Sequence, residues 1–586
     1  MTRCVPTDPE NAMISRFLST ASVSFLLACA VALAGCDGGG ASDDGGSQTV
    51  GEVITTNSAF TQAADGFDRA GTRAELSDPG AGPFTVFVPS DDAFAEINAP
   101  VLFEAGNEAV LAEVMEYHVV EDRFPVEGTP QTVFIESREG TEVRLTRTET
   151  GVFVNGVEVE QVADTRNGLV YRLDTVQLRV LTLAQRLDVM PELSRLNEIV
   201  DGTGLSTTLD QPGPFTLLAP TDAALRAFTD DVTANEPVFE ELLLYHLLPE
   251  DLMSVEVTDS RTVTTEEPDA GTVTFMRSGS TLFVNGILLA STDDIAENGV
   301  LHRVETPLNS GLSIAEVLSL RTDLATTSSL VSGSSSVLPP LSDEGRSLTF
   351  FAPDASAYDD VDVPVLEADA SLTDELFSYH LLDDGAFSAN ALRTGSPSRT
   401  TAEGTTVRVD ASGSVLQINR ATVTGPDVRA ANGVVHLLDG VLLETTRGTE
   451  RIQLTSRYRL FETALDRVGL ATTLASGTYT IFAPPNEAFL NALDTDGSGD
   501  IEDSEYPSDA ALEDILLYHV VPGTIPSGNI SDGDTATTLE GSSLVFDVAA
   551  DGTITINPGD EAAVVSPRDL DAENGVVHEV DVLLTP

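Results

Sequence analysis

Residues 84–94 read FTVFVPSDDAF, and close variants of this stretch occur three more times along the chain. The variants are FTLLAPTDAAL at 215–225, LTFFAPDASAY at 348–358 and YTIFAPPNEAF at 479–489. The prolines that end the apolar runs are separated by 131, 133 and 131 residues, and they are Pro89, Pro220, Pro353 and Pro484. The stretch therefore marks the same place in four copies of one unit.

Two further blocks recur in the same order within each unit. The second block reads MEYHVV, LLYHLLP, FSYHLL and LLYHVVP, and its Tyr-His pairs are Tyr117-His118, Tyr245-His246, Tyr379-His380 and Tyr518-His519. The third block closes each unit as NGLVYRLDTVQL from 167, NGVLHRVETPL from 298, NGVVHLLDGVLL from 432 and NGVVHEVDVLL from 574. Since solenoid repeats are about 20–50 residues long, this longer period predicts separate domains arranged as beads on a string.

Each unit is expected to contain helices in its first half and strands in its second half. A helical segment such as LSIAEVLSL at 312–320 precedes the apolar β run, and Thr221-Asp222 is typical of a helix cap after the proline. A second helix leads into the Tyr-His pair, and short β-branched strands and an Asn-Gly turn follow. Because helices and strands are segregated, the pattern predicts α+β domains. Their expected bounds are residues 50–180, 181–310, 311–445 and 449–586.

The three recurring blocks together resemble the fasciclin domain, and they cover about residues 48–586 in four copies. The resemblance implies that each domain is a compact β-sandwich-like wedge with helices packed on it. It also implies adhesion between cells, or between cell and matrix, without catalytic residues. In some animal members the Tyr-His pair and its apolar flanks form a receptor-binding motif, so the resemblance makes the four pairs candidates for adhesion contacts. The apolar flanks also favour a second interpretation, in which each His lies at the edge of a core and bonds to the backbone.

The other histidines occupy the closing block. They are His302, His436 and His578, and the first unit has Tyr171 at this place. A metal site built from two histidines per domain would lack a ligand in the first unit, which argues against it. The sequence has no Gly-x-Ser-x-Gly elbow, no phosphate-binding glycine loop and no His-Glu-x-x-His motif. It therefore favours a binding protein that is not an enzyme, with a polysaccharide-active enzyme built on a carboxylate pair as the alternative.

The charge of the chain is extreme. Its 586 residues carry a formal net charge of -64, and all 30 basic residues are arginines. Self-repulsion on this scale is reduced when salt or divalent cations screen it, so a salt-adapted source is expected. The basic footprint that nucleic acid binding requires is missing, which excludes nucleic acid as a partner. Apolar residues still make up 41% of the chain, enough for globular cores.

The N-terminus resembles a bacterial lipoprotein signal. Residues 17–34 are apolar and lead into Gly35 and Cys36, so residues 1–36 are interpreted as a signal that ends at a lipidated Cys36. An ordinary secretory signal is the alternative, and translation could begin at Met1 or at Met13. No cysteine follows Cys36, which excludes a disulfide framework in the domains. Residues 37–49 are rich in Gly, Ser and Asp and are predicted to be a flexible tether.

These features together predict an adhesion lipoprotein of the cell envelope. The lipid anchor would attach it to a membrane, with the outer membrane and the cell surface as the expected location. Its partner would be a cell-surface or matrix protein, a polysaccharide or a second copy of the same chain. The alternative is a periplasmic structural or scaffold lipoprotein, because Asp37 directly after Cys36 resembles an inner-membrane retention signal of enteric bacteria.

One stretch in the fourth unit does not belong to the repeat. From the repeat's proline to the Tyr of the pair, the four units span 28, 25, 26 and 34 residues. The excess in the fourth unit lies at DTDGSGDIEDSE, residues 494–505. This insertion is similar to an EF-hand calcium loop, which has Gly at its sixth place and an apolar residue at its eighth, here Gly499 and Ile501.

The spacing assigns a role to each expected calcium ligand. Oxygen atoms of Asp494, Asp496 and Ser498 would bind from places one, three and five; Asp500 would bind through its backbone carbonyl, Glu502 through water, and Glu505 through both carboxylate oxygens. Pro507 closely follows the last ligand and disfavours a helix directly after the loop, and the sequence has no second loop to pair with this one. We therefore expect a single weak site with a Kd of about 0.1–1 mM. The alternative is a solvated acidic loop.

Overall fold

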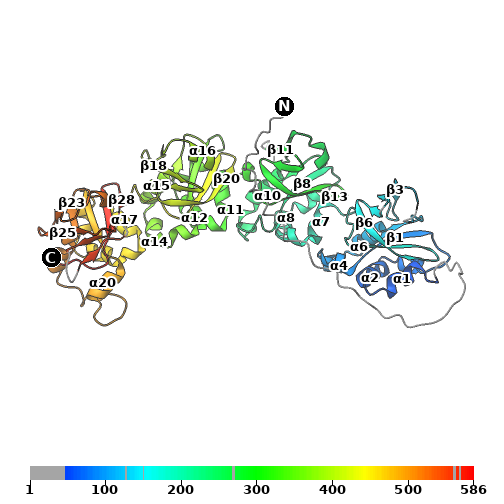
Figure 1. Ribbon diagram of the computed structural model, residues 1–586, viewed down its shortest axis with the longest axis horizontal. Coiled ribbons are helices and arrows are strands. Elements are labelled where there is room, and N and C mark those ends of the chain that lie inside the picture. Colours follow the sequence, from blue (N-terminus) through cyan, green and yellow to red (C-terminus); the bar gives the residue numbers. More distant parts are fainter. Residues whose placement is uncertain (1–46, 126–127, 150, 267–270, 558–561, 567–568) are drawn as a thin grey trace, which may run out of the picture.

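Four domains follow one another in an elongated, gently curved row (Figure 1). The computed structural model describes residues 47–125, 128–149, 151–266, 271–557, 562–566 and 569–586. The predicted signal with Cys36 and most of the predicted tether, residues 1–46, lie outside the described residues. Within the described part of the chain, no helix is both long enough and apolar enough to cross a bilayer.

Domain 1 has its helices first and most of its strands last. Its elements are α1 Val50–Thr56, α2 Thr61–Arg69, α3 Arg73–Leu76, β1 Phe84–Pro89, α4 Asp91–Ala95, α5 Ala99–Leu102, α6 Glu108–Tyr117, β2 Val119–Val120, β3 Gln131–Glu136, β4 Glu142–Arg147, β5 Val152–Val154, β6 Val157–Asp164 and β7 Gly168–Leu173. The predicted α+β class is therefore confirmed.

Domain 2 repeats this order. Its elements are α7 Leu183–Val189, η1 Pro191–Leu193, α8 Ser194–Thr203, α9 Ser206–Leu209, β8 Phe215–Pro220, η2 Thr233–Asn235, α10 Glu236–Tyr245, β9 Leu247–Leu248, η3 Ser254–Glu256, β10 Ser260–Thr264, β11 Thr272–Ser278, β12 Thr281–Val284, β13 Ile287–Ala296 and β14 Gly299–Val304.

Domain 3 adds a short helix, α16, between its second and third strands. Its elements are η4 Asn309–Gly311, α11 Ile314–Leu320, η5 Thr322–Leu324, α12 Ala325–Ser332, α13 Leu338–Leu341, β15 Leu348–Pro353, η6 Ala355–Tyr358, α14 Val363–Ala368, α15 Ala370–Tyr379, β16 Leu381–Leu382, α16 Ala389–Thr394, β17 Ser398–Thr400, β18 Thr406–Ser412, β19 Val415–Ile418, β20 Ala421–Ala430 and β21 Gly433–Leu438.

Domain 4 carries the insertion between two of its helices. Its elements are α17 Gly448–Leu454, η7 Ser456–Tyr458, α18 Arg459–Arg467, α19 Leu470–Leu474, β22 Tyr479–Ala483, α20 Asn486–Leu493, α21 Asp509–Tyr518, β23 Val520–Pro522, η8 Ser527–Asn529, β24 Thr535–Thr537, β25 Ser543–Val548, β26 Ile554–Ile556, β27 Ala563–Val564, β28 Leu570–Ala572 and β29 Gly575–Glu579.

The repeated apolar run forms an interior strand of each sheet, next to a short edge strand. In domain 1 the strand order is β2-β1-β7-β6-β5-β4-β3, and β1 pairs in parallel with β7, from Phe84 opposite Gly168 to Pro89 opposite Leu173. Domains 2 and 3 have the same seven-stranded order, whereas the described strands of domain 4 form two four-stranded sheets. Because β1 has neighbours on both of its faces, all six of its residues are buried.

Alternate residues of this repeated strand face two different cores. In domain 2, Leu217 and Ala219 of β8 pack in the core beneath the helices, and Leu218 packs in a second core with Phe275 of β11 and Val284 of β12. The repeated strands of domains 3 and 4 are divided between two cores in the same way. Each domain thus consists of a sheet that closes over an apolar interior on one face and is covered by helices on the other.

The asparagine of the Asn-Gly turn ties the helices to the closing strand. In domain 2 the side-chain oxygen of Asn298 accepts from the backbone N–H of Leu183 at 2.9 Å, at the start of α7. Its side-chain amide donates to the carbonyls of Leu209 and Gln211 at 2.6 and 2.8 Å, at the end of α9. The other domains repeat these bonds with Asn167, Asn432 and Asn574.

Consecutive domains share the first helix of the later domain. In α7, α11 and α17 the fifth residue packs in its own domain, and these residues are Leu187, Leu318 and Ile452. The seventh residue packs in the core of the preceding domain, and these residues are Val189, Leu320 and Leu454. Each seventh residue is at most 1% exposed. The domains are therefore docked through apolar contacts as well as joined by the chain.

Backbone hydrogen bonds complete the junctions. The N–H groups of Asn98, Thr229 and Asp362 donate to the carbonyl of the seventh helix residue of the next domain, at 2.8, 2.6 and 2.8 Å. At the second junction, the N–H of Thr322 donates in return to the carbonyl of Ala227 at 2.7 Å, and the third junction has the same return bond. Short antiparallel bridges result at the second and third junctions, where Phe228 pairs with Arg321 and Val361 pairs with Thr455.

Candidate functional site

The four Tyr-His pairs lie inside their domains. Each pair ends a helix (α6, α10, α15 or α21) and precedes a short edge strand. The tyrosines are 2–5% exposed and the histidines 0–1% exposed. The residues proposed as adhesion contacts therefore offer almost no surface to a partner while the domain is folded.

Both ring nitrogens of each of these histidines are engaged. In domain 2, Nδ1–H of His246 donates to the carbonyl of Leu242 at 2.7 Å, and Nε2 accepts from the backbone N–H of Leu308 at 2.9 Å. The same two bonds occur at His118, His380 and His519. The ring thereby ties the helix to the segment that leaves the closing strand.

Burial lowers the pKa of these four imidazole rings. Removal from water disfavours the charged imidazolium and lowers the pKa of each of the four histidines to about 4, although the backbone carbonyl that Nδ1 contacts opposes this shift. The rings are neutral at physiological pH. Their arrangement fits the second interpretation of the sequence, a histidine that bonds to the backbone at a core.

The tyrosine of the pair reaches the sheet. In domain 2 the hydroxyl of Tyr245 donates to the carbonyl of Thr272 at 2.8 Å and accepts from the side-chain amide of Asn285 at 3.2 Å. Asn285 has a φ of 48° in the turn between β12 and β13, a conformation that asparagine tolerates better than most residues. Equivalent Tyr–Asn bonds occur in domains 1, 3 and 4, so the pair connects the helix to the outer strands in every domain.

The second set of histidines is also engaged on both sides. Nε2–H of His302 donates to the carbonyl of Leu252 at 2.8 Å, and its Nδ1 accepts from the N–H of Asp293 at 3.0 Å. In domain 1 the hydroxyl of Tyr171 makes the first of these bonds instead, to the carbonyl of Phe124 at 2.8 Å. Tyr171 thus donates a hydrogen bond to a buried carbonyl, as His302 does.

The insertion in domain 4 folds as a tight acidic loop between α20 and α21. One carboxylate oxygen of Asp494 accepts from the N–H groups of Gly497 and Ser498 at 2.7 and 3.2 Å, and the other accepts from Gly499 at 3.0 Å. These bonds lower the pKa of Asp494, with the bond from Gly499 contributing most. The φ of Gly499 is 82°, so the turn at the sixth place is one that glycine favours.

The end of the loop returns to its beginning. Glu505 accepts from the backbone N–H groups of Thr495 and Glu502 at 2.7 and 3.0 Å, which lowers its pKa. Oxygen atoms of Asp494, Asp496 and Glu505 all lie within 4.8 Å of one another. Three of the six predicted ligands are thus brought together, a spacing that could hold a cation.

The remaining predicted ligands line the same turn without joining this group. The hydroxyl of Ser498 donates to the carbonyl of Asp500 at 3.1 Å, and the Asp500 carboxylate lies 4.0 Å from Arg459. The N–H of Glu502 is held by Glu505. Ile501, at the eighth place, is 8% exposed and packs in the core of domain 4, which anchors the loop.

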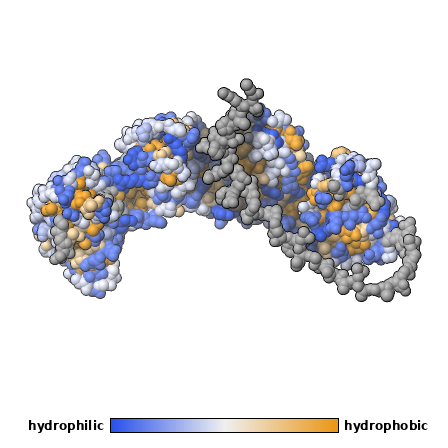
Figure 2. Space-filling model, viewed as in Figure 1, coloured by the Kyte–Doolittle hydropathy of each residue, from blue (hydrophilic) through white to orange (hydrophobic). Residues whose placement is uncertain are grey.

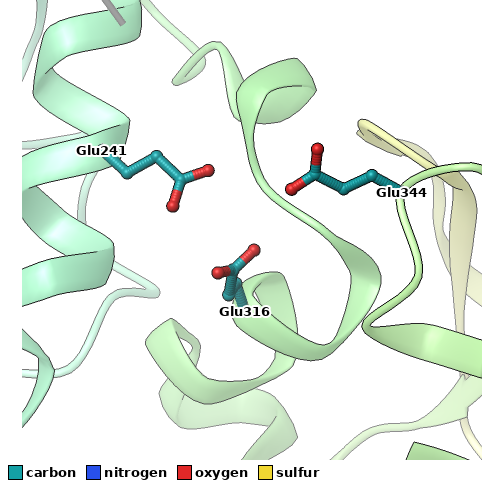
Figure 3. A group of neighbouring side chains, drawn as sticks. All are labelled: Glu241, Glu316 and Glu344. Carbon is teal, nitrogen blue, oxygen red and sulfur yellow. The ribbon is translucent and has the colours of Figure 1, made fainter. Parts of the chain in front are cut away.

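A second acidic group lies between domains 2 and 3. Glu241 comes from α10, Glu316 from α11 and Glu344 from the loop before β15, and their carboxylates point toward one another (Figure 3). Oxygen atoms of the three lie within 4.8 Å of one another. Glu316 also accepts from the N–H of Ser313 at 2.7 Å as part of the N-terminal cap of α11.

The other junctions carry related carboxylates. Burial raises the pKa of Glu113, and the nearby charges of Glu139 and of Glu297 in domain 2 raise it further. Burial likewise raises the pKa of Glu375, with Glu450 and Glu573 of domain 4 adding to the effect. None of these glutamates was predicted as a site residue from the sequence. The sequence does contain a pattern that could have pointed to them. An acidic residue stands four places before the Tyr of each pair, at Glu113, Glu241, Glu375 and Asp514.

A cleft of about 620 Å³ opens in domain 2 beside the first junction. Its lining includes Arg179, Asp210, Asp251 and Glu297, and it holds no histidine, serine or cysteine. The described walls of this cleft therefore lack a Ser-His or Cys-His pair of the kind used in nucleophilic catalysis.

The visible face of the row is mainly hydrophilic, with apolar residues in small patches (Figure 2). One such group crosses three strands of domain 2, where Phe283 lies opposite both Met276 and Leu288 in the ladder. Met276 is 52% exposed and Leu288 is 40% exposed. Scattered apolar residues of this kind are ordinary on protein surfaces.

Comparison with known proteins agrees with the repeated fold. The fasciclin domain profile matches residues 58–178, 191–310, 322–444 and 456–586. The chain is 27% identical over 568 residues to transforming growth factor-beta-induced protein ig-h3 of Oryctolagus cuniculus, covering 92% of this chain and 77% of that protein. It is 25% identical over 546 residues to human periostin, covering 89% of this chain and 61% of periostin.

Two further comparisons give shorter matches. Protein sll1483 of Synechocystis is 41% identical over 113 residues, which is 19% of this chain and 57% of that protein. A solved FAS1 domain pair from the insect cell adhesion molecule fasciclin I is 20% identical and covers 43% of this chain and 97% of that structure, with a TM-score of 0.23. Since the profile covers most of the sequence in four copies and the fold repeats with it, this chain belongs to the fasciclin domain family.

Proposed function

We propose that this protein is a non-enzymatic adhesion or binding protein in which four fasciclin domains act as one stiff row. The observation that carries the proposal is the docking of consecutive domains by a buried helix residue and backbone bonds at each junction. A row fixed in this way separates its two ends and presents several domain surfaces at once, which favours multivalent attachment. The engagement of the described histidines in hydrogen bonds within the fold supports a role without catalysis.

The binding partner is proposed to lie outside the cell. Family membership supports binding to a cell-surface or matrix protein or a polysaccharide, or pairing with a second copy of the chain. The net charge of -64 makes a partner with a basic surface the most favourable electrostatically. Such binding should weaken as salt is raised, because screening shortens the reach of surface charges.

An adhesion assay tests this proposal. Beads that carry the full chain are expected to clump with one another, or to be retained on films of basic matrix protein or of polysaccharide. Beads that carry an unrelated protein of similar negative charge are the control. Binding to none of the three surfaces above that control contradicts the proposal. The variant Tyr245→Phe keeps the buried ring and removes only its hydroxyl, so adhesion should be unchanged if the pair is structural.

Anchoring by lipid at Cys36 is the second part of the proposal. Its support is the sequence of residues 17–36, an apolar segment that ends in Leu-Ala-Gly-Cys. Mass spectrometry of the mature N-terminus is expected to find a diacylglyceryl group on Cys36. Surface labelling of intact cells then distinguishes display at the cell surface from the periplasmic alternative. A mature chain that begins beyond Cys36 excludes the anchor.

We also propose that the loop at 494–505 binds one calcium ion. The donor set is suited to a hard cation, since Asp494, Asp496 and Glu505 supply carboxylate oxygens and Asp500 supplies a carbonyl oxygen on the same turn. Bound calcium would offset the repulsion among these carboxylates. It would thereby stabilise the connection between α20 and α21.

Calcium titration with calorimetry and thermal unfolding tests the site. Calcium at several millimolar is expected to raise the unfolding temperature of domain 4 by a few degrees, given a Kd of about 0.1–1 mM. The variant Glu505→Gln should lose this shift. The matched control is Glu540→Gln, because Glu540 is also a half-buried glutamate that accepts a backbone N–H in a loop of domain 4. Equal calcium shifts in both variants would reduce the stretch to a solvated loop.

A further inference from the structure

The docking element of each junction has two halves. The later domain supplies the seventh residue of its first helix, which is Val189, Leu320 or Leu454, and the earlier domain supplies an extended strip nine residues after the repeat's proline. Both halves occur at all three junctions. Within the described residues no domain precedes domain 1 and none follows domain 4, so a complete half at either end would have no complement to bind.

At the front of the row, the apolar half is missing. The first helix of domain 1 reads VGEVITT, and its seventh residue is the exposed Thr56. Its fifth residue, Ile54, is buried in its own domain, like the fifth residues of the other first helices. Only the residue that would enter a preceding domain has become polar.

At the far end, the accepting strip is missing. The residue nine places after Pro484 is Leu493, and it lies in the last turn of α20. Helix α20 continues there, whereas Asn98, Thr229 and Asp362 offer a backbone N–H to the next domain. The N–H of Asp494 likewise donates within the helix, to Leu490 at 3.0 Å. No free edge of backbone is left at this place for a following domain.

The acidic loop follows α20 directly and contacts its own domain. Ile501 packs in the domain core, and Arg467 of α18 binds Asp503 and Asp509 at 2.6 and 3.0 Å. The Arg467 guanidinium also lies 4.9 Å from the centre of the Tyr506 ring. These contacts hold the loop against the helices of its own domain.

We infer that the extended helix α20 and the loop at 494–505 form a cap that closes the docking surface of domain 4, as Thr56 closes that of domain 1. The row consequently accepts neither a fifth domain nor a second copy of the chain end to end. Repeat arrays commonly have terminal units with a polar outer face, which keeps them soluble. The inference requires neither calcium nor an adhesion partner, so its failure leaves the proposed function untouched.

A five-domain chain tests the cap. In this chain, a second copy of residues 309–445 is joined directly after Leu584. Leu584 is the equivalent of Leu308, because its backbone N–H donates to His519 as that of Leu308 donates to His246. The added domain therefore follows domain 4 as domain 3 follows domain 2. In a second version, residues 491–508 are replaced by residues 227–235, which restores the strip of domain 2 and its spacing of 25 residues from proline to tyrosine.

Distances between spin labels report docking. The three native cysteines are changed to serine, and labels are placed at Asp532→Cys in domain 4 and at Glu367→Cys in the added domain. The parent five-domain chain should give a distance distribution at least about twofold broader than the version with the exchanged loop, since an undocked domain moves freely. The variant Leu320→Thr in the added domain should broaden the distribution of the exchanged version again.

The reference is the same measurement across the junction between domains 2 and 3, with labels at Asp259→Cys and at the native Glu367→Cys. A distribution in the parent five-domain chain that is as narrow as this reference overturns the cap. So does a distribution in the exchanged version that is as broad as that of the parent. If the exchanged domain 4 fails to fold, the parent chain decides alone, since a narrow distribution overturns the cap and a broad one supports it.

Discussion

At the scale of single residues, the repeated polar side chains of this protein are interior connectors. His246 joins the end of α10 to the chain that leaves β14, and Tyr245 joins the same helix to the outer strands. A neutral imidazole suits this place because one nitrogen donates and the other accepts. Each ring therefore satisfies two buried backbone groups that would otherwise be costly to leave without partners.

The protonation of these rings predicts sensitivity to acid. The pKa of each buried histidine of the Tyr-His pairs is about 4 in the folded protein and about 6.5 in the unfolded chain. Between these two values the unfolded chain binds protons that the folded chain does not, so the free energy of unfolding falls as pH falls from 6.5 to 4. The slope approaches about 1.4 kcal/mol per pH unit for each histidine.

A reciprocal exchange between domains isolates this effect. The pKa of His302 is lowered by burial, whereas Tyr171 at the same place in domain 1 does not titrate in this range. His302→Tyr should make domain 2 less sensitive to acid, and Tyr171→His should make domain 1 more sensitive. Hydrogen exchange with mass spectrometry at pH 7 and pH 5, corrected for intrinsic rates, resolves the two domains. Unchanged pH dependence in both variants contradicts the assignment.

At the scale of elements, one asparagine fixes the position of the helices on each sheet. Asn298 binds the start of α7 and the end of α9, although these lie far from it in the sequence. The seventh residue of α7 is also the one that docks into domain 1. The side chain of Asn298 therefore supports the fold of domain 2. Through α7 it also supports the junction with domain 1.

Removal of this asparagine should be costly. Asn298→Ala deletes three hydrogen bonds at a side chain that is 9% exposed and leaves buried backbone groups without partners. The expected loss is about 2–4 kcal/mol in the free energy of unfolding of domain 2. The control is Asn235→Ala, because Asn235 makes one exposed bond, to the carbonyl of Asp231. Denaturant unfolding, followed by hydrogen exchange in domain 2, should separate the two variants; equal losses would contradict the prediction.

At the scale of the whole molecule, charge and docking oppose each other. The chain carries a formal net charge of -64, and carboxylates of neighbouring domains meet at the junctions, as Glu241, Glu316 and Glu344 do. Apolar docking residues such as Leu320 and the backbone bridges hold the row together against this repulsion. The balance between the two should depend on ionic strength.

Salt should therefore stabilise both the domains and the row. Raising NaCl from 0.1 M to 1 M shortens the screening length from about 10 Å to about 3 Å and weakens repulsion between carboxylates. Calorimetry is expected to show higher unfolding temperatures at 1 M NaCl. X-ray scattering is expected to show that the maximum dimension of the particle is unchanged or varies over a narrower range. Sucrose at equal osmolality is the control, because it acts by exclusion from the surface and not by screening. If the unfolding temperature rises no more in NaCl than in sucrose, the electrostatic account is contradicted.

The amino-acid sequence by itself determined the architecture of the single domain. The recurrence of FTVFVPSDDAF and its variants established four copies, and the segregation of helices from strands established the α+β class. The twelve residues from Asp494 to Glu505 were recognised as foreign to the repeat from their length and spacing alone. These features are readable because they depend on residues close together in the chain or on comparison of one copy with the next.

Only the tertiary structure decided which residues face inward and how the domains meet. Apolar flanks and family resemblance gave two interpretations of the Tyr-His pair, and its burial depends on strands that follow much later in the chain. The docking of Leu320 into domain 2 could not be predicted from the sequence either. A helix that packs against two cores has the same spacing of apolar residues as a helix that packs against one. Burial is set by contacts between distant segments, and local periodicity does not specify which surface those segments cover.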